Sequence, residues 1–416
     1  VFKTVATDSS SIRKVCNDAN NDENCAGIIT WMHTFSPAKM WIHGLTELRK
    51  PLLHLHTQFN KEIPWGTIDM DFMNLNQAAH GDREFGYIGA RLDIPRKIVV
   101  GHWTDASVAD DIAKWMPSAV AITEGRTIKV ARFGDNMRDV AVTDGDRIEA
   151  EIKFGWTIDY YGVGDLVESI DKVTEDQISS LMSVYSDLYD IDPNAPVESI
   201  REQAKIEIGL KTFLDKGGYT AFTTNFQALH GMKQLPGLAV QHLMAEGYGF
   251  GAEGDWKTAA LIRAMKIMAN GKGTGLMEDY TYNLDSNNGL ILGAHMLEVC
   301  PTLAGTKPVI EVHPLGIGDK EDPARLVFKG ASGPAVAASL IDLGNRFRLI
   351  VNSVDAVEMK EDMPNLPVAS VLWKPQPSLK EGAKAWILAG GAHHTSFSFA
   401  LTEEQLVDWA DMVGIE

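Results

Sequence analysis

Short apolar runs alternate with helix-like segments through the first third of the chain, and this alternation constrains the fold more than any other feature. Residues 26–32 (AGIITWM) have the pattern of a buried strand, a helix is expected from Ser36 to Leu48, and residues 51–56 return to a strand. Two strands joined through a helix form a βαβ unit and are parallel. A second strand, helix and strand follow at residues 97–102, 106–120 and 127–133. The pattern therefore predicts an α/β fold.

Longer helices continue the pattern in the middle third, and one of them is expected to end at a left-handed cap at Gly217-Gly218. Beyond Leu276 the sequence changes to short strands with Gly and Pro turns, which indicates an antiparallel, barrel-like domain. Its strands are predicted at residues 289–296, 308–313, 325–328, 346–351 and 385–388. We expect a Rossmann-like α/β domain over residues 1–128, a second one over 129–275, and a β-barrel-like domain over 276–416.

Charge and cysteine content exclude several classes of function. The 38 basic and 56 acidic residues give a formal net charge of -18, which disfavours nucleic acid and anionic membrane surfaces as partners. No uncharged apolar run reaches the ~18 residues of a membrane helix. Three cysteines, at positions 16, 25 and 300, do not suggest a disulfide framework and favour a cytoplasmic location. The motifs of serine hydrolases, zinc fingers and P-loop proteins are absent from the sequence.

Glu253 is the first candidate for chemistry. It follows a short strand predicted at residues 248–252, and Asp255 is a suitable N-cap for a helix that begins at Trp256. Glu253 is therefore expected at the carboxyl edge of a parallel sheet, where ligands bind in open α/β folds. The alternative is a solvated loop carboxylate without a function.

Four further candidate residues lie in the last third of the chain. Glu278 is expected at the entrance to the barrel-like region, and His295 lies in an apolar strand, where it could also be a core histidine with a structural partner. His393 and His394 follow a Gly-Gly turn that we expect at the end of an apolar strand, although a polar loop would have the same pattern. Two carboxylates and two imidazoles would suit a divalent ion such as Mn(II).

The chain resembles the L-arabinose isomerase family over essentially its whole length. The motifs that carry the resemblance are HTFSPAKMWI (33–42), HTQFN (56–60), DMDFMNLNQAAHGDREFG (69–86), RFGDNMRDVAVTDGD (132–146), LHGMKQLPGLAVQ (229–241), EGDWKTAAL (253–261), MEDYTY (277–282), HMLEVCP (295–301), LGIGDKEDPARL (315–326) and ILAGGAHHT (387–395). Runs of this length do not arise by chance.

The resemblance implies a particular site and assembly. It implies one Mn(II) held by Glu253, Glu278, His295 and His394, with the two glutamates also acting as acid and base. It implies a sugar pocket lined by Met137, Phe226 and Ile317, with His80 contributed by a neighbouring subunit of a homohexamer. It also implies two α/β domains followed by a β-barrel-like domain, about one more βα unit before Val1, and a short tail after Glu416.

Several alternatives stay open at this point. Conversion of L-arabinose to L-ribulose can proceed through an enediol, which we favour, or through a metal-assisted hydride shift that uses the same ligands. A related isomerase, such as one for L-fucose, is the alternative enzyme. A catalytically silent sugar-binding or interaction protein on the same fold is the alternative from another class, although such a protein has no need of both carboxylates.

Overall fold

The computed structural model describes residues 1–3, 5–32 and 37–416, so the start of the helix predicted from Ser36 lies outside the described residues. The chain forms two compact units. The first contains Val1–Glu124 and Val407–Gly414, and the second contains Gly125–Leu406 and Ile415–Glu416. Among the described residues, none of the helices has the length and apolar character that crossing a membrane requires.

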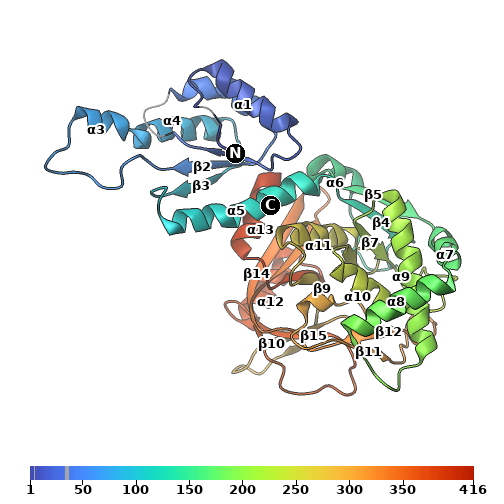
Figure 1. The fold of residues 1–416 in the computed structure, drawn as a ribbon. Coiled ribbons are helices and arrows are strands. Elements are labelled where there is room, and N and C mark those ends of the chain that lie inside the picture. The colour runs from blue at the N-terminus through green and yellow to red at the C-terminus, as the bar shows by residue number, and fades with distance from the viewer. Residues whose placement is uncertain (4, 33–36) are drawn as a thin grey trace. The chain divides into compact units, whose positions relative to one another are not determined.

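The first unit is built on a three-stranded parallel sheet, with the order β1 (Ile28–Thr30), β2 (Leu52–His56) and β3 (Lys97–Val100) (Figure 1). The strands and the parallel pairing agree with the prediction. The helical elements are α1 (Ser9–Asn21), the 3-10 helix η1 (Ala38–Trp41), α2 (Ile42–Glu47), α3 (Met70–Leu75), α4 (Ala78–Arg91), nearly all of α5 (Ala106–Gly125) and the part of α13 (Glu403–Val413) that begins at Val407. Leu53 and Leu55 of β2 share a buried cluster with Trp115 of α5, whereas Leu52 shares another with Phe85 of α4.

The second unit contains a four-stranded parallel sheet in the order β5-β4-β7-β8 (Figure 1). Its strands are β4 (Lys129–Phe133), β5 (Thr157–Tyr161), β7 (Ala221–Thr224) and β8 (Gly249–Gly251). Its helices are α6 (Arg147–Phe154), α7 (Val163–Asp171), α8 (Glu175–Leu188), α9 (Val197–Gly217), α10 (Leu238–Ala245) and α11 (Trp256–Met268). The predicted cap is confirmed, because α9 ends at Gly218 in the left-handed conformation.

The same unit also contains a closed antiparallel barrel in the order β10-β15-β14-β13-β16-β9 (Figure 1). Its strands are β9 (Thr274–Asn283), β10 (Leu290–Ala294), β13 (Gly333–Asp342), β14 (Phe347–Val357), β15 (Ser370–Pro375) and β16 (His394–Ser398). A smaller sheet pairs β11 (Val309–Val312) with β12 (Ala324–Val327) and β6 (Asp190–Ile191). Helix α11 packs against β7 and β8 of the parallel sheet and against β9 and β16 of the barrel. The predicted α/β class with a barrel-like C-terminal region is confirmed.

One predicted strand is wrong. Residues 385–388 belong to helix α12 (Leu379–Ala389), which begins after the N-cap Ser378 and ends at Gly390 with φ +86°. A short apolar run does not distinguish strand from helix, and here the cap residues at its two ends decide the structure. Ile387 and Leu388 stay exposed on this helix. The tandem histidines therefore follow a helix instead of an apolar strand, and His394 begins strand β16.

Candidate active site

Glu253 lies in the loop after β8, at the carboxyl edge of the parallel sheet. Its φ of +59° is rare for a residue other than glycine, and the next residue, Gly254, is also left-handed with φ +86°. Two backbone hydrogen bonds hold this turn: the amide of Met137 donates to the carbonyl of Glu253 (3.0 Å), and the amide of Gly254 donates to that of Thr224 (3.1 Å). The predicted cap is confirmed, because the Asp255 side chain accepts a hydrogen bond from the Thr258 amide.

The register of the barrel brings the other candidates together around Glu278, in the middle of β9. Glu278 pairs with His394 of β16 on one side and with Ala294 of β10 on the other, and His295 directly follows Ala294. A bulge between β9 and β10 leaves Tyr280 without a partner. Such bulges re-aim side chains and are frequent beside functional sites. Glu278 and His394, as a directly opposed pair, share one face of the sheet.

The Glu253 carboxylate lies close to the tandem histidines. Its Oε2 lies 3.3 Å from Nε2 of His393 and 3.9 Å from Nε2 of His394. The rings of His295 and His394 have centroids 5.6 Å apart. The structure thus brings together Glu253, Glu278, His295 and His394, the four ligands that the family resemblance implies. With His393, these residues are called the barrel-edge cluster below.

Charges within the barrel-edge cluster shift several pKa values. The hydrogen bond from His393, aided by nearby histidine charge, lowers the pKa of Glu253 despite partial burial. Burial alone would lower the pKa of His295, but the Glu298 carboxylate, 2.6 Å from its Nδ1, and the two cluster glutamates raise it to about 9. Burial and the charge of Glu278 raise the pKa of Asp279 to about 7. The ionised form of Glu253 is therefore favoured.

The buried imidazole of His394 indicates that a cation fits the cluster. The side chain is 1% exposed, and neither ring nitrogen has a hydrogen-bond partner in the described structure. Its Nδ1 lies 3.5 Å from a carboxylate oxygen of Asp255. Burying an unpaired polar group is costly, and a divalent ion would satisfy a ring nitrogen. Glu253, His393 and His394 each place a ligand atom within 4.8 Å of the others, so the nitrogen and oxygen donors fit such an ion.

The residues expected to line the sugar pocket lie near this edge. Phe226 and Ile317 are partly buried and pack against one hydrophobic cluster, and Met137 is partly exposed in the loop after β4. Phe226 lines a hollow of about 270 Å³ with Arg138, Gln227, Leu229, His230, Gly318, Asp319 and Lys320. His80 lies on the exposed side of α4, in the first unit.

Sequence reasoning missed two features. The sequence pattern gives His393 no role of its own, whereas the structure places it in hydrogen-bond contact with Glu253. A second group, formed by His54, His56 and Asp82 in the first unit, is not among the predicted sites, although it also places three ligand atoms within 4.8 Å of one another. The spacing His-x-His within a predicted strand was the available signal, because it puts both rings on one face.

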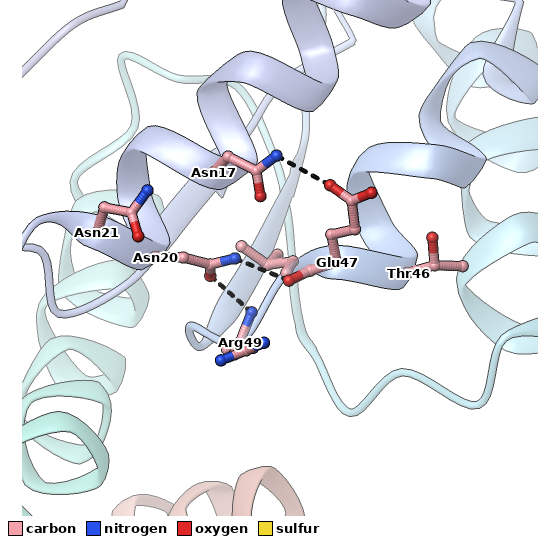
Figure 2. A pocket seen from close by; sticks show the side chains of 7 residues that line it. Asn17, Asn20, Asn21, Thr46, Glu47 and Arg49 are labelled. Carbon is pink, nitrogen blue, oxygen red and sulfur yellow. Dashed lines mark hydrogen bonds between the residues drawn. The ribbon is translucent and has the colours of Figure 1, made fainter.

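The hollow in Figure 2, of about 470 Å³, lies between the ends of α1 and α2 in the first unit. Its polar side chains already bind one another. Asn17 donates to the Glu47 carboxylate, and the Asn20 side chain bonds the Glu47 carbonyl and the Arg49 amide. Because Asn17, Asn20 and Glu47 already pair with one another, we assign no site here.

Comparison with known proteins gives the same family at every level. Family models for the N-terminal, central and C-terminal domains of L-arabinose isomerase match residues 1–127, 129–271 and 273–416. The chain belongs to the L-arabinose isomerase family. The enzyme "L-arabinose isomerase" of Clostridium beijerinckii is 89% identical over 416 residues, which are 100% of this chain and 85% of the relative. The protein of that name from Geobacillus stearothermophilus is 69% identical, and the one from Bacillus subtilis is 63% identical. Both matches include 100% of this chain, which spans 85% and 84% of the two relatives, respectively. The predicted family and the predicted isomerase class are confirmed.

Proposed function

We propose that this chain interconverts L-arabinose and L-ribulose at the barrel-edge cluster. The observation that carries the proposal is the convergence of Glu253, Glu278, His295 and His394 from the parallel sheet and three barrel strands. A structural role does not require two carboxylates and two imidazoles gathered at an open sheet edge. The family match supports the choice of sugar, and an L-fucose isomerase remains the alternative enzyme to be tested.

We further propose that Glu253, Glu278, His295 and His394 hold one divalent ion, preferably Mn(II). When bound, this ion would supply Lewis-acid chemistry by polarising the carbonyl of the sugar. The Glu298 carboxylate, which binds Nδ1 of His295, would fix the ring so that Nε2 is free to ligate. His393 would orient Glu253 through its hydrogen bond.

The two glutamates are the proposed proton carriers. One carboxylate takes the proton from C2 of the aldose while the carbonyl oxygen on C1 gains a proton, which gives an enediol. The proton is then delivered to C1 and the hydroxyl on C2 loses its proton, so the ketose forms with no net gain or loss. The lowered pKa of Glu253 keeps it ionised, as a base must be, and Glu278 is then the partner acid.

Substrate contacts and assembly complete the proposal. Met137, Phe226 and Ile317 would line the sugar pocket, and His80 of the partner subunit would reach in across a homohexamer. The three-domain division at residues 128/129 and 275/276 and a cytoplasmic location also stay predictions. Family-model boundaries between residues 127 and 129 and between residues 271 and 273 support the first, and three free cysteines support the second.

The test is an assay of the purified chain with L-arabinose and with L-fucose, run in D2O. We expect L-ribulose from L-arabinose, much slower turnover of L-fucose, and deuterium at C1 of the product, because an enediol route exchanges the migrating proton with solvent. Product without deuterium would favour the hydride shift. Absence of any L-ribulose would overturn the proposed function.

A further inference from the structure

The residues His54, His56 and Asp82, called the β2–α4 cluster, form a second group of metal-type ligands in the first unit, outside the proposed active site. Strand β2 supplies the two histidines and helix α4 supplies the carboxylate. Side chains two residues apart on a strand share a face, so His54 and His56 lie on the same face as Leu52. Leu52 packs in one buried cluster with Phe85 of α4, so this face is directed toward α4. An apolar side chain would be expected at position 54.

Asp82 is a carboxylate on the buried face of α4. Ala78, Asp82 and Phe85 are spaced for one helix face and are all buried, and the Asp82 side chain is only 3% exposed. Placing a charge in such surroundings costs several kcal/mol unless partners offset it. Its Oδ2 binds Nδ1 of His56, and its Oδ1 lies 2.9 Å from Nε2 of His54. Both oxygens therefore face an imidazole.

His54 is the observation that points to a ligand. The side chain is 3% exposed, its ring packs edge to face on Phe85 with centroids 4.9 Å apart, and neither ring nitrogen makes a hydrogen bond within the described structure. The Oδ1 atom of Asp82 is also left without one, because its approach to His54 lacks hydrogen-bond geometry. If these three side chains interacted only with one another, hydrogen bonds would be expected to join these atoms.

We infer that His54, His56 and Asp82 bind a divalent cation of the Zn²⁺ type that joins β2 to α4. Two imidazoles and one carboxylate are donors that Zn²⁺ prefers, with a water molecule as fourth ligand. Ligands at about 2.1 Å from a tetrahedral ion lie about 3.4 Å apart. The donor atoms here lie within 4.8 Å of one another, so small side-chain movements close the site. The inference does not depend on the proposed function.

Zinc content measured on the full chain tests this site. Metal-free protein is dialysed against micromolar Zn²⁺, and bound zinc is counted by mass spectrometry. The Asp82→Asn variant keeps the side-chain shape but removes the charge. Glu84→Gln is the matched control, because Glu84 is an exposed carboxylate two residues further along the same helix. We expect Asp82→Asn to bind one equivalent fewer than Glu84→Gln, whatever zinc the barrel-edge cluster takes up.

A second variant keeps the test decisive if Asp82→Asn does not fold. His56 is 32% exposed, so His56→Gln should retain native circular dichroism while it loses the same equivalent. Zn²⁺ should also raise the melting temperature of Glu84→Gln more than that of His56→Gln. Equal zinc content in folded His56→Gln and Glu84→Gln would overturn the inference and leave a hydrogen-bonded His-Asp-His network.

Discussion

The barrel-edge cluster and the β2–α4 cluster use the same kinds of side chain in opposite settings. The first combines loop and strand-end residues with Glu278, which lies beside a bulge in β9, and its Glu253 has a left-handed backbone. The second lies within a regular strand and a regular helix. Exposure does not separate the clusters, because each has a buried histidine (His394 at 1% and His54 at 3%) and a more exposed one (His393 at 36% and His56 at 32%). Loop positions and backbone strain suit chemistry on a substrate, and a position between regular elements suits a structural bond.

Removing a barrel-edge carboxylate should have the largest effect of any change. Glu253→Gln and Glu278→Gln each keep side-chain volume but lose a charge, a ligand and a proton carrier. Turnover of L-arabinose should fall by about 10²- to 10⁴-fold in each variant, with native circular dichroism. Glu358→Gln, an exposed carboxylate in the same unit, is the matched control and should be near wild type.

Metal content separates the two roles of these glutamates. A variant that retains Mn(II) but has lost turnover indicates proton transfer, and parallel loss of both indicates ligation. Near wild-type rates in both Glu253→Gln and Glu278→Gln would make the site assignment wrong and leave the barrel-edge cluster without a catalytic role.

Mn(II) should stabilise the unit that contains the barrel-edge cluster. A ligand that binds only the folded state at 100 times its Kd contributes about 2.7 kcal/mol. We therefore expect a rise of several degrees in the melting temperature of metal-free protein on addition of Mn(II), and a smaller rise in Glu278→Gln. An unchanged wild-type melting temperature at saturating Mn(II) would count against a metal site here.

The strained turn at Glu253 should be sensitive to a single methyl group. Gly254 has φ +86°, and a Cβ there would lie 2.7 Å from Cα of Asn136. Gly254→Ala should lower the free energy of unfolding by about 1–3 kcal/mol and reduce turnover as Glu253 shifts. Gly164→Ala, in helix α7 with no atom within 4 Å of its Cβ, is the control and should be neutral or stabilising. Equal stability of the two variants would show that the turn is not constrained.

Subunit mixing should have the smallest measurable effect, a partial recovery of activity. If His80 of the partner subunit completes each site, inactive His80→Ala and inactive Glu278→Gln chains should form some intact sites in mixed oligomers. Mass-tagged subunits would establish that exchange has occurred, and unmixed samples are the control. Exchanged oligomers without any recovered activity would refute a shared site.

The two clusters also differ in how far the sequence predicts them. The cap at Asp255 and the strand before it placed Glu253 correctly at the sheet edge, because local signals decide both features. The pairing of Glu278 with His394 depends on barrel register and on a bulge at Tyr280, which no local pattern specifies. Asp82 is 26 residues from His56, so their contact follows only from how α4 packs on β2.

Metal dependence of turnover is the most direct test of the account. The purified chain is chelated exhaustively, its metal content is measured, and L-ribulose formation is followed as Mn(II), Co(II) or Mg(II) is added. Imidazole ligands favour the first two ions over Mg(II). We predict negligible turnover in the metal-free chain and recovery with Mn(II) or Co(II) that exceeds recovery with Mg(II). Full turnover in the metal-free chain would contradict the account.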